Sequence, residues 1–151
     1  ADDRGAPVLP AGLLGSISHK ADLAVALLAR DADPRARVGV DVEDDRPGKL
    51  DVSSRVLRDE ELAALADLGE PARGSEVLLR FSLKEAVYKA LDPFVRRYVG
   101  FKEVAVTVNA DGSAEVQPHL EQGEGPFVFA ARWKRERGLI VATVRVVAGA
   151  G

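Results

Sequence analysis

Three charged residues stand close together in an otherwise apolar segment in the middle of this chain. The segment at residues 81–89, Phe-Ser-Leu-Lys-Glu-Ala-Val-Tyr-Lys, carries Lys84, Glu85 and Lys89. Its apolar residues recur at helical spacing around most of the circumference, so the helix should be central. A carboxylate on a buried helix is strongly disfavoured unless a cation or several hydrogen-bond donors face it. Glu85 therefore predicts either a local ion pair, for which Lys89 is suitably spaced, or a bound metal ion.

Two further carboxylates occur at residues 38–43, Val-Gly-Val-Asp-Val-Glu, which alternate with the period of a strand. Asp41 and Glu43 lie on one face, roughly 6.5 Å apart along the backbone, so their side chains can converge on one ion. Together with Glu85 they would supply three oxygen ligands, a set that suits a hard cation such as Mg²⁺. A solvated strand face and a simple helical ion pair remain alternatives.

A third polar segment, Gly-Ser-Ile-Ser-His-Lys at residues 15–20, precedes the acidic strand. It offers the hydroxyl of Ser18, the imidazole of His19 and the ammonium of Lys20 beside a flexible glycine, all of which can donate to an anion. A lone histidine is more often structural than functional, so His19 gains weight only from its neighbours.

Taken in this order, the segments Ser-Ile-Ser-His-Lys, Val-Gly-Val-Asp-Val-Glu and Phe-Ser-Leu-Lys-Glu-Ala-Val-Tyr-Lys resemble the three signature blocks of the 4'-phosphopantetheinyl transferases of the Sfp/EntD type. Smaller similarities at residues 4–10, 56–62 and 89–101 resemble the enterobactin-synthase-like branch. The resemblance implies transfer of the phosphopantetheine arm of coenzyme A to a serine of an acyl or peptidyl carrier protein, with release of adenosine 3',5'-bisphosphate.

The resemblance also implies roles for single residues. Asp41, Glu43 and Glu85 would hold Mg²⁺ against the diphosphate of coenzyme A. Glu85 would also be the general base that accepts the serine proton. Lys84 and Lys89 would contact the phosphates, and Lys89 would stabilise the leaving group as its negative charge grows.

Three residues nearer the amino terminus would complete the coenzyme A site. By the same resemblance, Ser18 and His19 match the positions that hold the 3'-phosphate, and Arg4 is an additional phosphate contact. Lys20 could join them.

The elements that would position these residues indicate an α+β fold with antiparallel sheets. Residues 23–29 are apolar throughout, so periodicity alone allows helix or strand, and we favour a strand because a turn follows. A central helix should begin after a cap at Ser75 and stop before Pro93. Strands are expected at residues 14–19, 23–29, 38–43, 104–108, 114–117, 127–133 and 139–147, and a surface helix at 58–68.

In the family that the chain resembles, two similar α+β halves meet at a cleft that holds the active site. We therefore expect a single transferase domain over residues 1–151, with residues 1–38 as the remnant of a trimmed first half and residues 39–151 as the second half. Because the chain begins in the middle of that first half, it is expected to be a fragment, such as a domain cut from a polyketide synthase that would associate with other synthase domains.

Composition excludes several classes of protein. The chain of 151 residues is 46% hydrophobic, enough for one domain with its own core. It has no cysteine, so a disulfide, a thiolate metal site and a cysteine nucleophile are excluded. The net charge of −3 argues against a general nucleic-acid binder. No apolar run approaches the roughly 20 residues that span a bilayer, so a cytoplasmic protein with no membrane partner is expected.

Two other functions use the same residues. A different Mg²⁺-dependent phosphoester enzyme could be built on the three acids. An inactive, transferase-like domain of a synthase could bind carrier proteins without modifying them.

Overall fold

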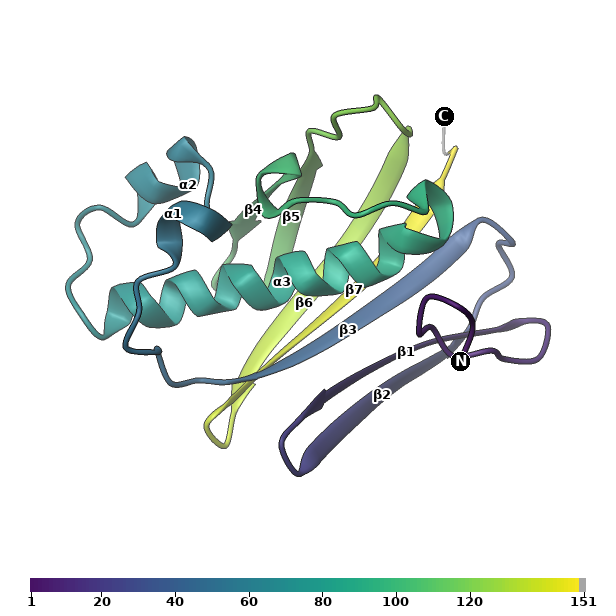
Figure 1. Ribbon diagram of the computed structural model, residues 1–151, viewed down its shortest axis with the longest axis horizontal. Coiled ribbons are helices and arrows are strands. Elements are labelled where there is room, and N and C mark those ends of the chain that lie inside the picture. Colours follow the sequence, from purple (N-terminus) through teal and green to yellow (C-terminus); the bar gives the residue numbers. More distant parts are fainter. Residues whose placement is uncertain (150–151) are drawn as a thin grey trace.

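The computed structural model describes residues 1–149 and has an α+β architecture with antiparallel strands, as predicted (Figure 1). A two-stranded hairpin lies beside a five-stranded sheet of order β3-β7-β6-β5-β4, and one long helix crosses that sheet. The elements are β1 (Leu13–Lys20), β2 (Leu23–Arg30), β3 (Ala36–Asp44), α1 (Ser53–Val56), α2 (Asp59–Ala64), α3 (Ala72–Val95), η1 (Phe101–Glu103), β4 (Val104–Val108), β5 (Ser113–Pro118), β6 (Phe127–Glu136) and β7 (Leu139–Ala148).

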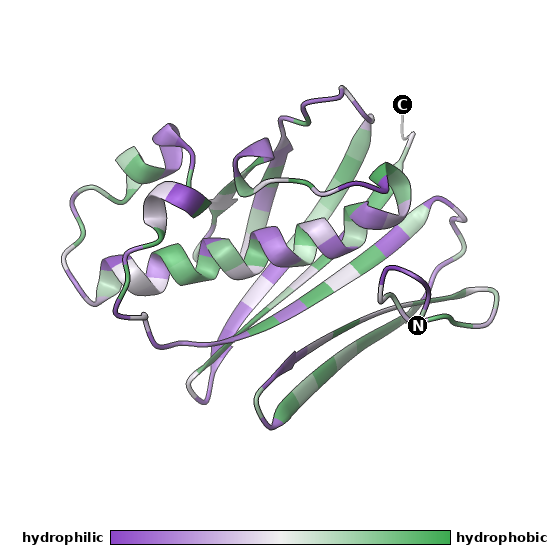
Figure 2. Ribbon diagram, viewed as in Figure 1, coloured by the Kyte–Doolittle hydropathy of each residue, from purple (hydrophilic) through white to green (hydrophobic). Residues whose placement is uncertain are grey.

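The strand predicted at residues 23–29 is confirmed as β2, which pairs with β1 along its whole length. Hydrophobic residues extend over much of this hairpin (Figure 2). The division into residues 1–38 and 39–151 stays a prediction, and residues 150 and 151 lie outside the described part of the chain. None of the helices in residues 1–149 is both long and apolar enough to span a lipid bilayer.

The bounds of two predicted helices were wrong. The surface helix predicted at residues 58–68 is the shorter α2, and α3 begins before Ser75 instead of being capped by it. Pro93 lies inside α3, which continues through its last turn before Arg96 leaves in a left-handed conformation. A proline this close to a helix end removes one hydrogen bond and already has a helical φ, so the helix does not need to stop at it.

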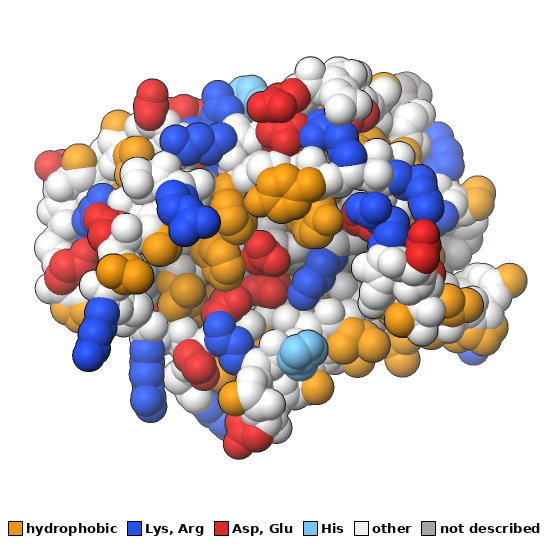
Figure 3. Space-filling model, viewed as in Figure 1, with side chains coloured by type: hydrophobic (Ala, Val, Ile, Leu, Met, Phe, Trp, Pro, Cys, Tyr) orange, Lys and Arg blue, Asp and Glu red, His pale blue; other side chains and the backbone are white. Residues whose placement is uncertain are grey.

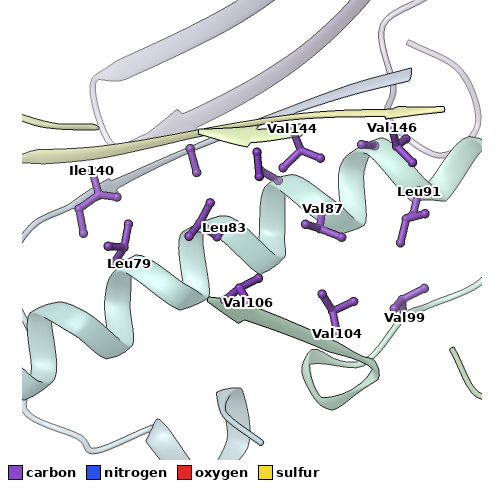
Figure 4. Close-up of a cluster of buried hydrophobic side chains, with 14 residues drawn as sticks. Leu79, Leu83, Val87, Leu91, Val99, Val104, Val106, Ile140, Val144 and Val146 are labelled. Carbon is purple, nitrogen blue, oxygen red and sulfur yellow. The ribbon is translucent and has the colours of Figure 1, made fainter. Parts of the chain in front are cut away.

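The main core lies between α3 and the sheet. Leucine and valine side chains recur every four residues on the buried side of α3 and pack against β7 and β4 (Figure 4). Their spacing keeps them on one face of the helix, which fixes the rotation of α3 about its axis. The labelled residues of this cluster are Leu79, Leu83, Val87, Leu91, Val99, Val104, Val106, Ile140, Val144 and Val146.

The hairpin attaches to the edge of the sheet through serine hydroxyls. On the free edge of β3, the backbone N–H of Val40 donates to Ser16 Oγ at 3.0 Å, and that of Val42 donates to Ser18 Oγ at 3.3 Å. Because both serines and both valines are two residues apart, the hydroxyls match the repeat of the strand. The hydroxyls thus accept hydrogen bonds from backbone N–H groups of β3 that β7, on the other side of that strand, does not reach.

A glycine on β3 allows the close approach of α3. A Cβ atom at Gly39 would lie 2.0 Å from the carbonyl oxygen of Ala86 and 2.9 Å from the backbone nitrogen of Ala90. These neighbours are backbone atoms of a packed helix, so they have little freedom to move away. Gly39 therefore brings the helix onto the strand that carries Asp41.

We expect Gly39→Ala to lower the free energy of unfolding by about 3 kcal/mol, because the added methyl group overlaps the α3 backbone. Urea denaturation monitored by circular dichroism measures the change. Gly48→Ala is the control, since no atom lies within 4 Å of a Cβ placed there. Equal stability of the two variants would contradict the close approach of α3 and β3.

Candidate active site

The side of α3 that faces β3 and the hairpin carries polar residues on successive turns. The members of this polar stripe are Ser82, Glu85, Lys89 and Asp92. Their spacing of three or four residues keeps them on one side of the helix. Three of the four bond to β3 or to the amino-terminal segment, so the stripe joins the helix to the elements across the cleft.

Asp41 of β3 is the meeting point of these elements. Its side chain is buried, and the residue is only 4% exposed. One carboxylate oxygen accepts a hydrogen bond from Ser82 Oγ of α3 at 2.8 Å, and the other accepts one from Ser18 Oγ of β1 at 3.3 Å. Lys89 donates to the carbonyl oxygen of Val40 at 2.8 Å and lies 3.4 Å from Asp41 Oδ1. A buried carboxylate is thus stabilised by donors from two other elements.

Glu43 lies two residues further along the same face of β3 and is also buried. Its carboxylate pairs with Lys20 at the end of β1. Burial raises the pKa of Glu43 and the neighbouring charge of Asp41 adds to this, while Lys20 acts in the opposite direction. The hairpin therefore supplies a cation to one of the two acids on the strand.

Glu85 is the acid without such a partner. Its side chain is partly buried, and no group in residues 1–149 donates a hydrogen bond to its carboxylate. Burial raises the pKa of Glu85, and the charges of Asp41 and Glu43 raise it further, against the opposing effect of Lys89. A partly desolvated carboxylate with a raised pKa is well suited to accept a proton.

The three predicted metal ligands share one region but do not form a ready-made metal site. Asp41, Glu43 and Glu85 influence one another electrostatically, and their oxygens are the ligand type that Mg²⁺ prefers. Within residues 1–149, however, no group of three or more His, Cys, Asp or Glu side chains is arranged to hold a metal ion. Lys20 and Lys89 contact two of the acids instead. The donor types fit a hard cation, and the ligand set stays a prediction.

A cavity of about 680 Å³ lies between the amino-terminal segment, the hairpin and α3. Glu85 and Lys89 line it from the helix, Arg4 from the amino-terminal segment and Arg37 from β3. Figure 3 shows acidic side chains gathered near the middle of this face, between the hairpin and α3, with basic side chains beside them. The size is that of a typical small-ligand pocket, and its lining is mixed in charge, with these cations beside acids such as Asp31 and Asp92.

A second, smaller cavity of about 220 Å³ lies on the other side of Glu85. Aromatic side chains form part of its wall, among them Tyr98 and Phe101 from the segment after α3. Glu85 and Tyr88 line both cavities. The unpaired carboxylate therefore lies where two cavities meet, so that it can reach groups that enter from either one.

The structure does not support Ser18 as a phosphate contact. Its hydroxyl donates to Asp41 and accepts from the backbone of Val42, and the residue is buried. A hydroxyl has a single proton to donate, so Ser18 has none left for a ligand. His19 is exposed on the opposite face of β1, and its contact with a phosphate stays a prediction.

Lys84 also has a role other than the one predicted. Its ammonium donates to the carbonyl oxygens of Val56 at 2.7 Å and Phe101 at 3.0 Å, and to the carboxylate of Glu61 at 2.6 Å. Both charged side chains are almost inaccessible, with 1% and 4% exposed. These contacts use all three protons of the ammonium, and the phosphate contact of Lys84 stays a prediction. Lys84 instead ties α3 to α1, α2 and η1.

Glu61 is the partner that the sequence analysis missed. Its other oxygen accepts the backbone N–H of Val106 at 2.8 Å. It belongs to a run of three acids at residues 59–61, which is typical of an exposed helix start. Only the tertiary structure shows that Glu61 is buried while its two acidic neighbours are exposed. Burial lowers the pKa of Lys84, and Glu61 opposes this shift.

We expect Lys84→Met to lower the free energy of unfolding by about 3 kcal/mol, since it leaves the carboxylate of Glu61 buried without its cation. Chemical denaturation measures this loss, and the exposed Lys102→Met is the control. A Lys84→Met protein as stable as the control would contradict the structural role.

Glu85→Gln should raise the melting temperature at pH 7.5, and the gain should shrink as the pH falls towards 5. In the folded protein the pKa of Glu85 is raised, so its ionised form is disfavoured above that pKa and the cost disappears below the unfolded value. Thermal unfolding of both proteins across this pH range measures the difference. A gain that grows at lower pH would contradict a raised pKa.

The sequence matches two families of known proteins. Residues 37–144 match the family described as 4'-phosphopantetheinyl transferase superfamily, and residues 1–29 match the 4'-phosphopantetheinyl transferase N-terminal domain.

Curated relatives carry the same description. The chain is 34% identical to the 4'-phosphopantetheinyl transferase Svp of Streptomyces mobaraensis, over 98% of this chain and 62% of the relative. It is 33% identical to PptT of Mycobacterium tuberculosis, over 94% of this chain and 66% of the relative. Enterobactin synthase component D of Salmonella austin is 33% identical over 70% of the chain and 43% of its own length. The chain thus spans slightly less than two thirds of the length of the first two relatives.

Solved structures share the fold at lower sequence identity. The apo-ACPS of Chronobacterium ammoniagenes superposes with a TM-score of 0.60 at 19% identity, covering 75% of this chain and 96% of that one. The holo-(acyl-carrier-protein) synthase of Bacillus anthracis gives 0.60 at 21% identity, covering 74% and 96%. Since one family covers most of the chain, including β3 and α3, and the fold agrees, this protein belongs to the 4'-phosphopantetheinyl transferase superfamily.

Proposed function

We propose that this chain transfers the 4'-phosphopantetheine arm of coenzyme A to a serine of an acyl or peptidyl carrier protein. One structural observation carries the proposal: the carboxylate of Glu85 accepts no hydrogen bond within residues 1–149 and lies where two cavities meet. Membership of the family supports it. Because the chain spans less than two thirds of the length of Svp and of PptT, the activity of the whole protein is part of the proposal.

In this reaction Glu85 is the general base. The serine oxygen of the carrier attacks the phosphorus next to the pantetheine arm, and its proton passes to Glu85. The bond from that phosphorus to the adenosine 3',5'-bisphosphate breaks, and the nucleotide leaves with the bonding electron pair. Lys89, whose ammonium has one proton left after its contacts with Val40 and Asp41, stabilises the charge that grows on the leaving group.

Asp41, Glu43 and Glu85 are the proposed ligands of Mg²⁺. When bound there, the ion would neutralise charge on the diphosphate and orient it. Two ammonium groups already face the acids, Lys20 at Glu43 and Lys89 at Asp41. We propose that these contacts loosen when the diphosphate and its cation are bound, because the phosphates then attract the lysines.

The nucleotide is proposed to occupy the cavity of about 680 Å³, with Arg4 and Lys89 as phosphate contacts from its lining. His19 lies outside this lining, and its contact with the 3'-phosphate stays a prediction. Solved neighbours with the same fold include a Chronobacterium ammoniagenes ACPS–CoA complex and a Bacillus anthracis synthase in complex with CoA (3',5'-ADP). Carrier proteins are the proposed macromolecular partner. A cytoplasmic location and association with other synthase domains remain predictions.

The test is modification of apo carrier proteins, followed by intact mass spectrometry in the presence of coenzyme A and Mg²⁺. The wild type should add one phosphopantetheine group. Glu85→Gln should lower the rate at least about 100-fold, because the general base is lost while the side-chain shape is kept. Calorimetry should still detect coenzyme A binding to the variant.

Glu115→Gln, the same chemical change at an exposed position on β5, is the control and should behave like the wild type. Near-normal modification by Glu85→Gln would refute the base assignment. Hydrolysis of coenzyme A without a carrier would indicate another phosphoester enzyme, and binding of carriers without modification would indicate a docking domain. Either of these results would refute the proposed function.

A further inference from the structure

Arg4 and Asp92 join the amino-terminal segment to the last turns of α3. The two residues are 88 positions apart, and Arg4 Nε donates to Asp92 Oδ2 at 2.8 Å. Arg4 Nη2 donates to the other oxygen, so the carboxylate is held by two parallel bonds. The side chain of Asp92 is only 14% exposed. Such a bidentate pair fixes the direction of a guanidinium as well as its position.

The pair leaves part of the guanidinium available. Arginine has five N–H groups, and Asp92 accepts from two of them, on the Nε and Nη2 edge. The side chain of Tyr88 also interacts with the guanidinium, which leaves N–H groups over on a residue that lines the larger cavity. Asp92 therefore orients a cation that still has donors for an anionic ligand.

The segment that carries Arg4 is ordered by its own contacts. The carboxylate of Asp2 accepts the backbone N–H groups of Arg4 and Ala6, which closes a tight turn. The ion pair with Asp92 ties this preformed turn to α3. Because residues of the turn line the cavity, the pair also fixes one wall of it.

Asp92 stands two turns of helix after Glu85, about 10 Å along the axis. Lys89 lies between them on the same stripe. Arg37 lines the same end of the cavity as Asp92, with its guanidinium 5.3 Å from the ring centre of Phe94. The lining also carries the acids Asp2, Asp31 and Asp33 at this end, so within it the two arginines and Lys89 are the groups that can bind an anion.

We propose that Asp92 is a positioning residue for ligand binding: it holds Arg4 so that the free edge of the guanidinium binds a phosphate group of the nucleotide. This inference rests on the proposed function, since it takes a phosphate-bearing nucleotide as the ligand. Asp92 itself does not touch that ligand. Its loss frees a long side chain that must then be ordered when the ligand binds.

Asp92→Asn tests the proposal, because asparagine keeps the shape but removes the charge that holds Arg4. Calorimetry with coenzyme A and with adenosine 3',5'-bisphosphate should show about tenfold weaker binding of both. In the transfer assay KM for coenzyme A should rise while kcat changes less than about twofold. Glu76→Gln, which breaks an ion pair with Arg80 at the other end of α3, is the control and should leave both affinities unchanged.

The exchange variant Arg4→Asp with Asp92→Arg separates positioning from stability. It restores an ion pair between the same two sites, so the melting temperature should return towards that of the wild type. Affinity should stay low, because the guanidinium now extends from α3 instead of the cavity wall. Recovery of both quantities, or unchanged affinity in Asp92→Asn, would overturn the proposal.

Because binding is measured without a carrier, the two hypotheses fail in different ways. A wild type that binds the nucleotide but modifies no carrier would refute the proposed function and leave the role of Asp92 to be decided by its variants. A wild type that modifies carriers, with affinity unaffected by Asp92→Asn, would refute only the role of Asp92.

Discussion

The arrangement of the site depends on the hydrogen bonds that the buried carboxylate of Asp41 accepts. It accepts hydrogen bonds from Ser82 of α3 and Ser18 of β1, so it requires both elements to lie against β3. That approach is possible because Gly39 has no side chain to hold the helix away. A charge in such a place is costly unless donors surround it, so the same bonds that stabilise Asp41 also fix Glu85 and Lys89 at the cleft.

The charges around the cleft are unequal. Among the residues that the structure describes, two ammonium groups face three carboxylates, and Glu85 has no hydrogen-bonded partner. Burial favours the protonated form and repulsion among the acids adds to this effect, so Glu43 and Glu85 both have raised pKa values although each lies near a lysine. In the proposed function, such a site gains stability from a bound cation and Glu85 accepts the proton.

Local pattern was enough to predict the strand around Asp41 and the central helix, and the resemblance of three segments to known signature blocks indicated the family. Local pattern could not predict long-range pairing, because spacing within one segment does not say which distant group a charged side chain will contact. Lys84 looks like a cleft residue in sequence, yet it pairs with Glu61, 23 positions away, inside the protein. Ser18 likewise serves the edge of β3, which only the tertiary arrangement reveals. Arg4 was placed near the site by resemblance, whereas its partner on α3 was not foreseen.

The serine contacts between the hairpin and β3 have a mechanical consequence. They are made by side chains, so β1 can separate from β3 without breaking any backbone ladder within either sheet. Opening along this seam would cost less than unfolding the five-stranded unit, and amide exchange at Val40 and Val42 would report it. This seam of side-chain contacts therefore runs beside Asp41, the acid at which β1, β3 and α3 meet.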